Sequence, residues 1–137
     1  MKVCVLGAGG FIGKNLLRDT NWVGVTRGVL DLENQNDVET YFKTHTYDVV
    51  VHCGVVGGSR LKKDAGDVLW KNILMFENVV RVFKGKLIYF SSGAALCGSP
   101  PNRPLWVFVA SRTSVGRSTY FSLRVWAIKL PFLYYAI

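Results

Sequence analysis

The stretch VLGAGGFIG, residues 5–13, decides the fold class of this 137-residue chain. It joins a short apolar run typical of a buried strand, Lys2–Leu6, to a segment whose apolar residues have helical spacing, Phe11–Arg18. Three glycines follow one another at intervals of three residues, Gly7, Gly10 and Gly13. Glycines at such a turn permit a tight bend, a close approach of the backbone to a pyrophosphate, and close packing of the helix on the sheet. The stretch therefore predicts a strand–turn–helix unit that binds a dinucleotide through backbone N–H groups at the helix start.

One position departs from the usual dinucleotide pattern. Ile12 stands where the motif G-x-G-x-x-G has its last glycine. A tight turn without a ligand is therefore the alternative interpretation of the same residues. The strand–turn–helix context favours the dinucleotide site, because that context is what gives the motif its meaning.

The rest of residues 1–99 alternates between strand-like and helix-like segments. Strands are expected at 2–6, 22–27, 29–32, 48–53 and 86–90. Helices are expected at 11–18, from Asn34 or Asn36 through Phe42, and from Asp64 or Asp67 through Phe83. Such alternation predicts an α/β fold with a doubly wound, mostly parallel sheet in the strand order 3-2-1-4-5. The ligand crevice is then expected between the first and the fourth strand.

Residues 100–137 lack this alternation. We expect a nucleotide-binding domain at 1–99 and an irregular basic and apolar tail at 100–137. Leu105–Ala110 is apolar enough to form a strand that covers the edge of the strand at 86–90, whereas Tyr120–Leu130 is compatible with strand or helix. The second half of the doubly wound fold is incomplete in this sequence. A reading-frame change near residue 104, or a truncation, is the hypothesis that accounts for it.

Charge and cysteine usage narrow the functional class. The formal charge is +8, and every acidic residue lies at or before Glu77. This asymmetry is compatible with a nucleic-acid or membrane-surface patch, but the basic residues are scattered singly among apolar ones, which disfavours nucleic acid as a partner. Three widely spaced cysteines argue against a disulfide scaffold or a zinc site and favour the cytoplasm. No signal peptide, membrane span or metal site is expected.

The end of the second expected strand bears on the choice of dinucleotide. An acidic residue there binds the ribose 2′-hydroxyl of NAD, whereas a basic residue accommodates the 2′-phosphate of NADP. The sequence has Arg27 and no acid at this point. It therefore favours NADP over NAD, with a surface arginine as the alternative interpretation.

Five segments together carry a resemblance to a known family. They are KVCVLGAGGFIGKNLL (2–17), VLDLEN (29–34), YDVVVHCGVVGG (47–58), VLWKNILMFENVV (68–80) and KLIYFSSGA (86–94). In this order they resemble the extended short-chain dehydrogenase/reductase family, the NAD(P)-dependent epimerases, dehydratases and reductases of nucleotide-sugars. The resemblance covers about residues 2–99 and implies a Rossmann-like fold, a dinucleotide cofactor, a nucleotide-sugar substrate and, as an open alternative, a homodimer.

The resemblance also assigns roles to single residues. Asp31 and Leu32 match a pair that lies against the adenine, and Asn72 matches an asparagine that buttresses the sheet. Cys53 and Gly54 match a small-residue pair whose backbone lines the cofactor crevice. Asp31 as a helix cap, Asn72 as a solvated residue and His52 as a core residue are the plainer interpretations. The full set expected to bind the cofactor is Gly7, Gly9, Gly10, Phe11, Ile12, Gly13, Arg27, Asp31, Leu32, Cys53, Gly54, Val55 and Asn72.

The catalytic set of the family is incomplete in this sequence. The family uses a serine or threonine after the fifth strand together with Tyr-x-x-x-Lys; Ser92 is the candidate serine. No Tyr-x-x-x-Lys follows it, and Tyr120 is followed four residues later by Arg124, which differs from lysine in shape and hydrogen-bond geometry. Three functions stay open on the sequence: a nucleotide-sugar enzyme, a cofactor-binding module without catalysis, and an inactive truncated product.

Overall fold

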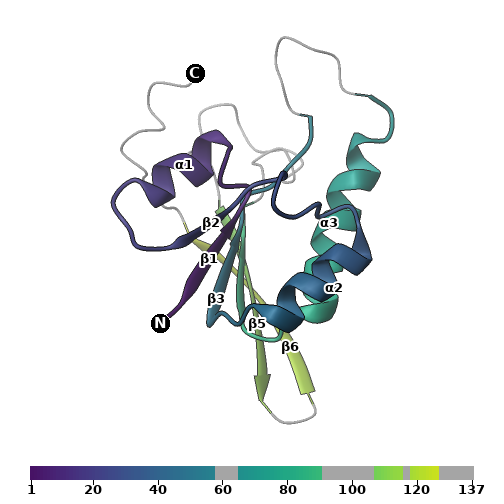
Figure 1. Ribbon diagram of the computed structural model, residues 1–137. Helices are drawn as coiled ribbons and strands as arrows, with labels where there is room; N and C mark the ends of the chain where they lie inside the picture. Colours follow the sequence, from purple (N-terminus) through teal and green to yellow (C-terminus); the bar gives the residue numbers. More distant parts are fainter. Residues whose placement is uncertain (58–64, 91–106, 116–117, 127–137) are drawn as a thin grey trace.

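The computed structural model describes residues 1–57 and 65–90, and the backbone of the strand residues 107–115 and 118–126 (Figure 1). In chain order the elements are β1 (Val3–Leu6), α1 (Phe11–Leu17), β2 (Val23–Val25), α2 (Gln35–Thr44), β3 (Val49–His52), α3 (Val68–Val82), β4 (Lys86–Tyr89), β5 (Val107–Val115) and β6 (Ser118–Trp126). Asn34 caps α2, since its side-chain oxygen accepts the N–H groups of Asn36 and Asp37. Asp67 is the residue that precedes α3.

The first four strands form one parallel sheet in the order β2-β1-β3-β4. Their carboxyl ends are level, because Leu6 is in register with Val25 and His52, and His52 with Tyr89. The chain moves outward from β1 to β2 on one side and to β3 and β4 on the other. The α/β doubly wound class is confirmed, with the reversal of direction, where such sheets bind ligands, between β1 and β3.

The expected strand at 29–32 is wrong, and with it the five-strand order 3-2-1-4-5. The backbone N–H groups of Val29 and Leu30 donate to the carbonyl of Thr26 at 3.0 and 3.1 Å, so this segment is a turn. Leu30 and Leu32 are buried while Val29 is 65% exposed. This alternation imitates the period of a strand. Without that strand, the remaining four have the order that was expected.

Helices cover both faces of the parallel sheet (Figure 1). On one face, Cys4, Leu6 and Val50 pack with side chains of α2 and α3. On the other, Val3, Val5, Val49 and Val51 pack with Leu16 and Leu17 of α1. Alternate residues of each strand therefore point to opposite layers, as a strand buried on both sides requires.

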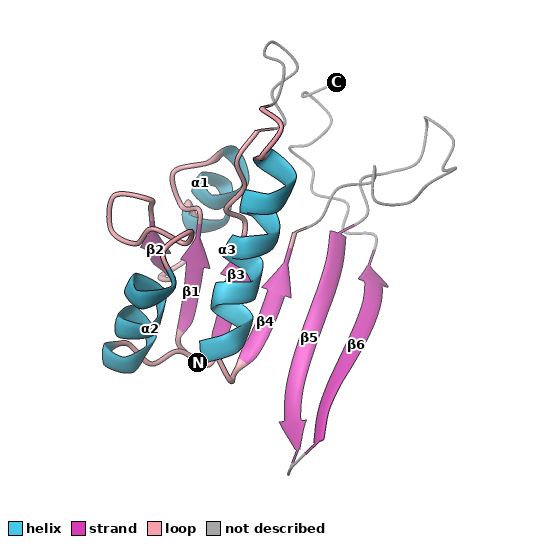
Figure 2. Ribbon diagram, turned by 90° about the vertical axis from the view of Figure 1, so that its right-hand side faces the viewer, coloured by secondary structure: helices cyan, strands magenta, loops and turns pink. Residues whose placement is uncertain are grey.

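Beyond β4 the described backbone forms an antiparallel pair. β5 pairs with β6 from Val107 opposite Trp126 to Val115 opposite Ser118. β5 lies beside β4 (Figure 2). The strand expected at 105–110 therefore overlaps β5, which lies at the expected edge of the sheet. Of the segment 120–130, which was compatible with strand or helix, residues 120–126 belong to strand β6. In the part of the chain that the structure describes, no helix is long and apolar enough to cross a membrane.

Candidate functional site

A cavity of about 230 Å³ opens at the carboxyl ends of β1, β2 and β3. The glycine turn after β1 forms one wall, the segment from Val25 to Leu32 a second, and Gly54–Val56 a third. Met75 of α3 closes it from the side. The cavity therefore lies where the sheet reverses direction, between β1 and β3.

The wall after β1 is shaped by close backbone packing. Gly7 has a φ of +84°, a conformation that favours glycine, and a Cβ there would come within 2.5 Å of the Gly54 nitrogen. A Cβ at Gly13 would collide with the carbonyl oxygen of Gly7 and would lie 2.7 Å from the Cα of Ala8. These two glycines allow β1, α1 and the loop after β3 to meet at van der Waals distance.

Gly9 and Gly10 differ from these two, because they border open space. The nearest atom to a Cβ at Gly9 would be the Thr26 methyl at 3.8 Å, and at Gly10 the Gly7 carbonyl oxygen at 3.4 Å. Both residues line the cavity. The Gly10 N–H donates to the Gly7 carbonyl at 3.0 Å, and the first α-helical bond of α1 runs from the Lys14 N–H to the Gly10 carbonyl. The N–H groups of residues 11–13, which lie between, are those that a helix start leaves without an intrahelical acceptor. The rim is thus bare backbone, which fits a pyrophosphate.

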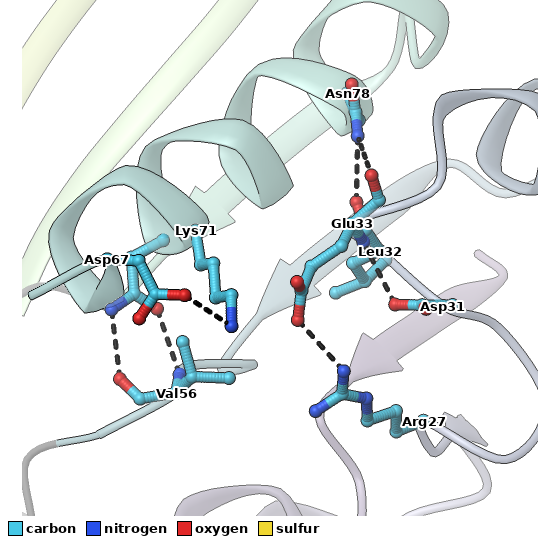
Figure 3. Close-up of polar contacts among 9 residues, drawn as sticks. Arg27, Asp31, Leu32, Glu33, Val56, Asp67, Lys71 and Asn78 are labelled. Carbon is cyan, nitrogen blue, oxygen red and sulfur yellow. Dashed lines mark hydrogen bonds and ion pairs between the residues drawn. The ribbon is translucent and has the colours of Figure 1, made fainter. Parts of the chain in front are cut away.

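The loop after β3 is anchored to α3 through Asn72. The Val56 N–H donates to Asn72 Oδ1 at 2.9 Å, and Asn72 Nδ2 donates to the Val56 carbonyl at 3.0 Å. The dashed lines that reach Val56 in Figure 3 mark these two bonds. Asn72 itself does not line the cavity. Its side chain positions the Gly54–Val56 wall, a role that the spacing of 16 residues between the partners does not reveal in the sequence.

The far end of the cavity carries charged side chains. The Arg27 guanidinium donates from Nη2 to Glu33 Oε1 at 2.9 Å. Asp31 Oδ1 accepts the Glu33 N–H at 3.1 Å, so Asp31 stabilises the turn before α2 rather than capping the helix. Arg27, Asp31 and Leu32 of the expected set line the cavity, together with Thr26 and Leu30, which are not in that set.

A buried asparagine supports this end. Asn78 is 1% exposed, and its Nδ2 donates to the carbonyls of Leu32 at 2.9 Å and Glu33 at 3.3 Å (Figure 3). Sequence reasoning missed it. The sequence holds one indication of this role: Asn78 is a polar residue in the apolar stripe of α3. A polar side chain that is buried there needs a hydrogen-bond partner.

His52 and Cys53 lie at the end of β3 behind the cavity wall. Burial lowers the pKa of His52 to about 4, which keeps the ring neutral at physiological pH. The His52 ring contacts the Tyr89 ring edge-on, with 5.3 Å between the ring centroids. Burial raises the pKa of the Cys53 thiol to about 12, so it is a packing residue, not a nucleophile. The plainer interpretation of His52, a core residue, agrees with this placement.

The structure brings together most, but not all, of the expected set. Gly7, Gly9, Gly10, Arg27, Asp31, Leu32, Gly54 and Val55 line the cavity, whereas Phe11, Ile12, Gly13, Cys53 and Asn72 lie outside its lining. Ser92 lies outside the described residues. Tyr120 and Arg124 are on strand β6, where four residues span about 13 Å, twice the rise of about 6 Å over four helical residues.

Comparisons with known proteins show the family of the chain. Residues 3–120 match the model of the NAD dependent epimerase/dehydratase family. Over 64 residues the chain is 36% identical to GDP-L-colitose synthase of Yersinia pseudotuberculosis. This alignment covers 42% of this chain and 21% of that protein.

Two solved structures from Campylobacter jejuni have similar folds. A GDP-6-OMe-4-keto-L-xylo-heptose reductase is 26% identical with a TM-score of 0.64, over 74% of this chain and 33% of that one. A GDP-mannoheptose C4 reductase with NADP bound is 26% identical with a TM-score of 0.63, over 74% and 34%. This chain thus spans about a fifth of the curated relative and about a third of these structures. Because the family model matches most of its length, the chain belongs to the NAD-dependent epimerase/dehydratase family.

Proposed function

We propose that the cavity binds NADP in preference to NAD, and that the chain is the cofactor-binding part of an enzyme acting on a nucleotide-sugar. The observation that carries this proposal is the cavity between β1 and β3, bordered by Gly9 and Gly10 without side chains. A pyrophosphate needs close approach to bare backbone, and this rim offers it.

Each wall has a part in holding the cofactor. The turn from Gly7 to Gly13, with Phe11 and Ile12 at its helical end, would hold the pyrophosphate. Asp31 and Leu32 would flank the adenine, and Gly54 and Val55, backed by Cys53 and Asn72, would border the path toward the nicotinamide. A bound nicotinamide supplies hydride transfer, and Ser92 is proposed to orient a substrate hydroxyl.

NADP is favoured by two independent observations. Arg27 lines the cavity at the end of β2, where a guanidinium can pair with a 2′-phosphate. The GDP-mannoheptose C4 reductase, 26% identical over the aligned part, has NADP bound.

The proposed nucleotide-sugar substrate rests on three similar proteins, all of them named as enzymes of GDP-sugars. A binding module without catalysis is the second candidate. It is favoured by the strand spacing of Tyr120 and Arg124, which differs from that of a Tyr-x-x-x-Lys pair on a helix.

A second copy of the chain and a cytoplasmic location complete the proposal. Leu69, Trp70 and Ile73 on α3 are exposed, 72% in the case of Leu69, and a homodimer would cover them. Cys4 and Cys53 are free thiols, which suits a reducing compartment. Sedimentation velocity tests the dimer: a species of single-chain mass at all concentrations would contradict it.

Titration with NADPH, followed by cofactor fluorescence, tests the proposed function. The wild-type chain is expected to bind, and Gly9→Asp, which puts a carboxylate into the cavity, is expected to weaken binding at least tenfold. Gly66→Asp is the matched control, because no atom lies within 4 Å of a Cβ there and it does not line the cavity. Equal binding by both variants would contradict the site, and turnover of GDP-sugars by the wild-type chain would exclude the non-catalytic alternative.

A further inference from the structure

Arg27 is the one cationic side chain among the described residues that line the cavity, and it is already paired. Its Nη2 lies 2.9 Å from Glu33 Oε1. A guanidinium that meets a carboxylate at this distance gives up part of its capacity to bind a second anion. The ion pair therefore bears directly on what Arg27 can do in the site.

Glu33 is the less exposed partner of this ion pair, and two hydrogen bonds hold its backbone. The Glu33 backbone N–H is held by Asp31 Oδ1, and its carbonyl by Asn78 Nδ2 (Figure 3). The Glu33 side chain is 21% exposed, against 69% for Arg27. The structure thus fixes the backbone of Glu33 and buries most of its side chain, whereas most of the Arg27 side chain is exposed to solvent.

A second cation, Lys71, is also paired with a carboxylate. Lys71 Nζ lies 2.7 Å from Asp67 Oδ2, and this hydrogen bond raises the pKa of Lys71 while it lowers that of Asp67. The charges of Glu33 and Arg27 also act on the pKa of Lys71, so the two pairs are neighbours (Figure 3). Each of the two cations is thus paired with a carboxylate, so the positive charge that Arg27 offers a 2′-phosphate is partly neutralised.

We propose that Glu33 is a specificity-determining residue, which weakens the preference for NADP over NAD by holding the Arg27 guanidinium. A 2′-phosphate must draw Arg27 away from Glu33, whereas the uncharged ribose of NAD need not. The inference rests on the proposed dinucleotide site and adds to it a residue that does not itself line the cavity.

The test compares dissociation constants of NADPH and NADH for the full chain and its Glu33→Gln variant. Glutamine keeps the shape and removes the charge. The NADPH dissociation constant is expected to fall about fivefold, the equivalent of one partly exposed ion pair, and that of NADH to change less than about twofold. Glu39→Gln is the matched control, because it removes one charge and one ion pair, with Lys43, outside the cavity lining.

An Arg27→Met background separates the pair from a general charge effect. There the gain from Glu33→Gln is expected to shrink below about twofold, since no guanidinium remains to be released. An undiminished gain in that background, an equal change for both cofactors, or no change with NADPH would overturn the role of Glu33 while leaving the dinucleotide site intact. Failure of every variant and of the wild-type chain to bind either cofactor would overturn the proposed function and this inference together.

Discussion

The two ends of the cavity are built in different ways. At the glycine turn, backbone meets backbone: Gly7 faces Gly54 so closely that a single methyl group has no room. At the Arg27 end, partly exposed side chains meet through an ion pair and a few hydrogen bonds. The first end is set by steric exclusion, which is costly to violate, and the second by electrostatics, which water and salt screen. Shape should therefore decide whether a dinucleotide binds, and charge which one.

The largest effect is expected at the glycine turn. Gly7→Ala forces a residue with a Cβ into a φ of +84° and against the Gly54 backbone. The free energy of unfolding should fall by about 3 to 4 kcal/mol, the sum of backbone strain and overpacking. Urea unfolding measures it. Gly28→Ala is the control, because its Cβ would meet no atom closer than 3.9 Å, and an equal loss in both variants would refute steric exclusion as the cause.

The next largest effect is the pH dependence of stability that comes from His52, a buried residue of β3. Burial lowers the pKa of His52 to about 4, below its ordinary value of 6.5, so the unfolded chain binds the proton more readily. The stabilisation is complete above pH 6.5 and is lost as the pH falls toward 4. Between pH 7.5 and 4.5 this group should remove about 2.5 kcal/mol from the free energy of unfolding.

The His52→Leu variant should lose that part of the pH dependence, measured by urea unfolding at both pH values. His45→Gln alters the other histidine, whose side chain is exposed, and should keep the wild-type slope. A wild-type slope in His52→Leu would contradict a neutral, buried ring.

A smaller effect is expected where the core supports the charged end. Asn78→Ala leaves the Leu32 and Glu33 carbonyls without their donor, and should lower the free energy of unfolding by about 2 kcal/mol. Asn15→Ala, which removes a hydrogen bond to the Phe11 carbonyl at an exposed site, should cost less than about 1 kcal/mol. Thermal unfolding compares the two variants. Equal stability would contradict the claim that the hydrogen bonds of Asn78 hold the turn at Leu32 and Glu33.

The smallest effect is expected from the ion pair itself. Glu33→Gln should change the free energy of unfolding by no more than about 1 kcal/mol, because Arg27 is largely exposed. Chemical denaturation at low and high salt measures it. A loss above about 2 kcal/mol would remove the contrast between the two ends, since the charged end would then be as structural as the glycine turn.

The glycine turn was predictable from sequence, whereas at the charged end the sequence indicated Arg27, Asp31 and Leu32 but not the contacts that hold them. Glycines spaced along a strand–turn–helix segment predict the turn, because residues with a side chain rarely fit its backbone conformation. By contrast, the alternation of Val29, Leu30 and Leu32 looked like a strand, since period-two burial also arises in a turn packed on a core. The contacts of Asn72 with Val56, and of Asn78 with Glu33, join residues 16 and 45 positions apart, so their pairing depends on the tertiary fold.

The most direct test of the dinucleotide site is a ¹H–¹⁵N NMR titration of the full chain with NADP. The backbone amides expected to shift are those of Gly9, Gly10, Arg27, Asp31, Gly54 and Val55, which surround the cavity. The amides of Tyr41 and Tyr47, which do not line the cavity, should stay in place. Shifts confined to residues away from the cavity, or none at millimolar cofactor, would contradict the account.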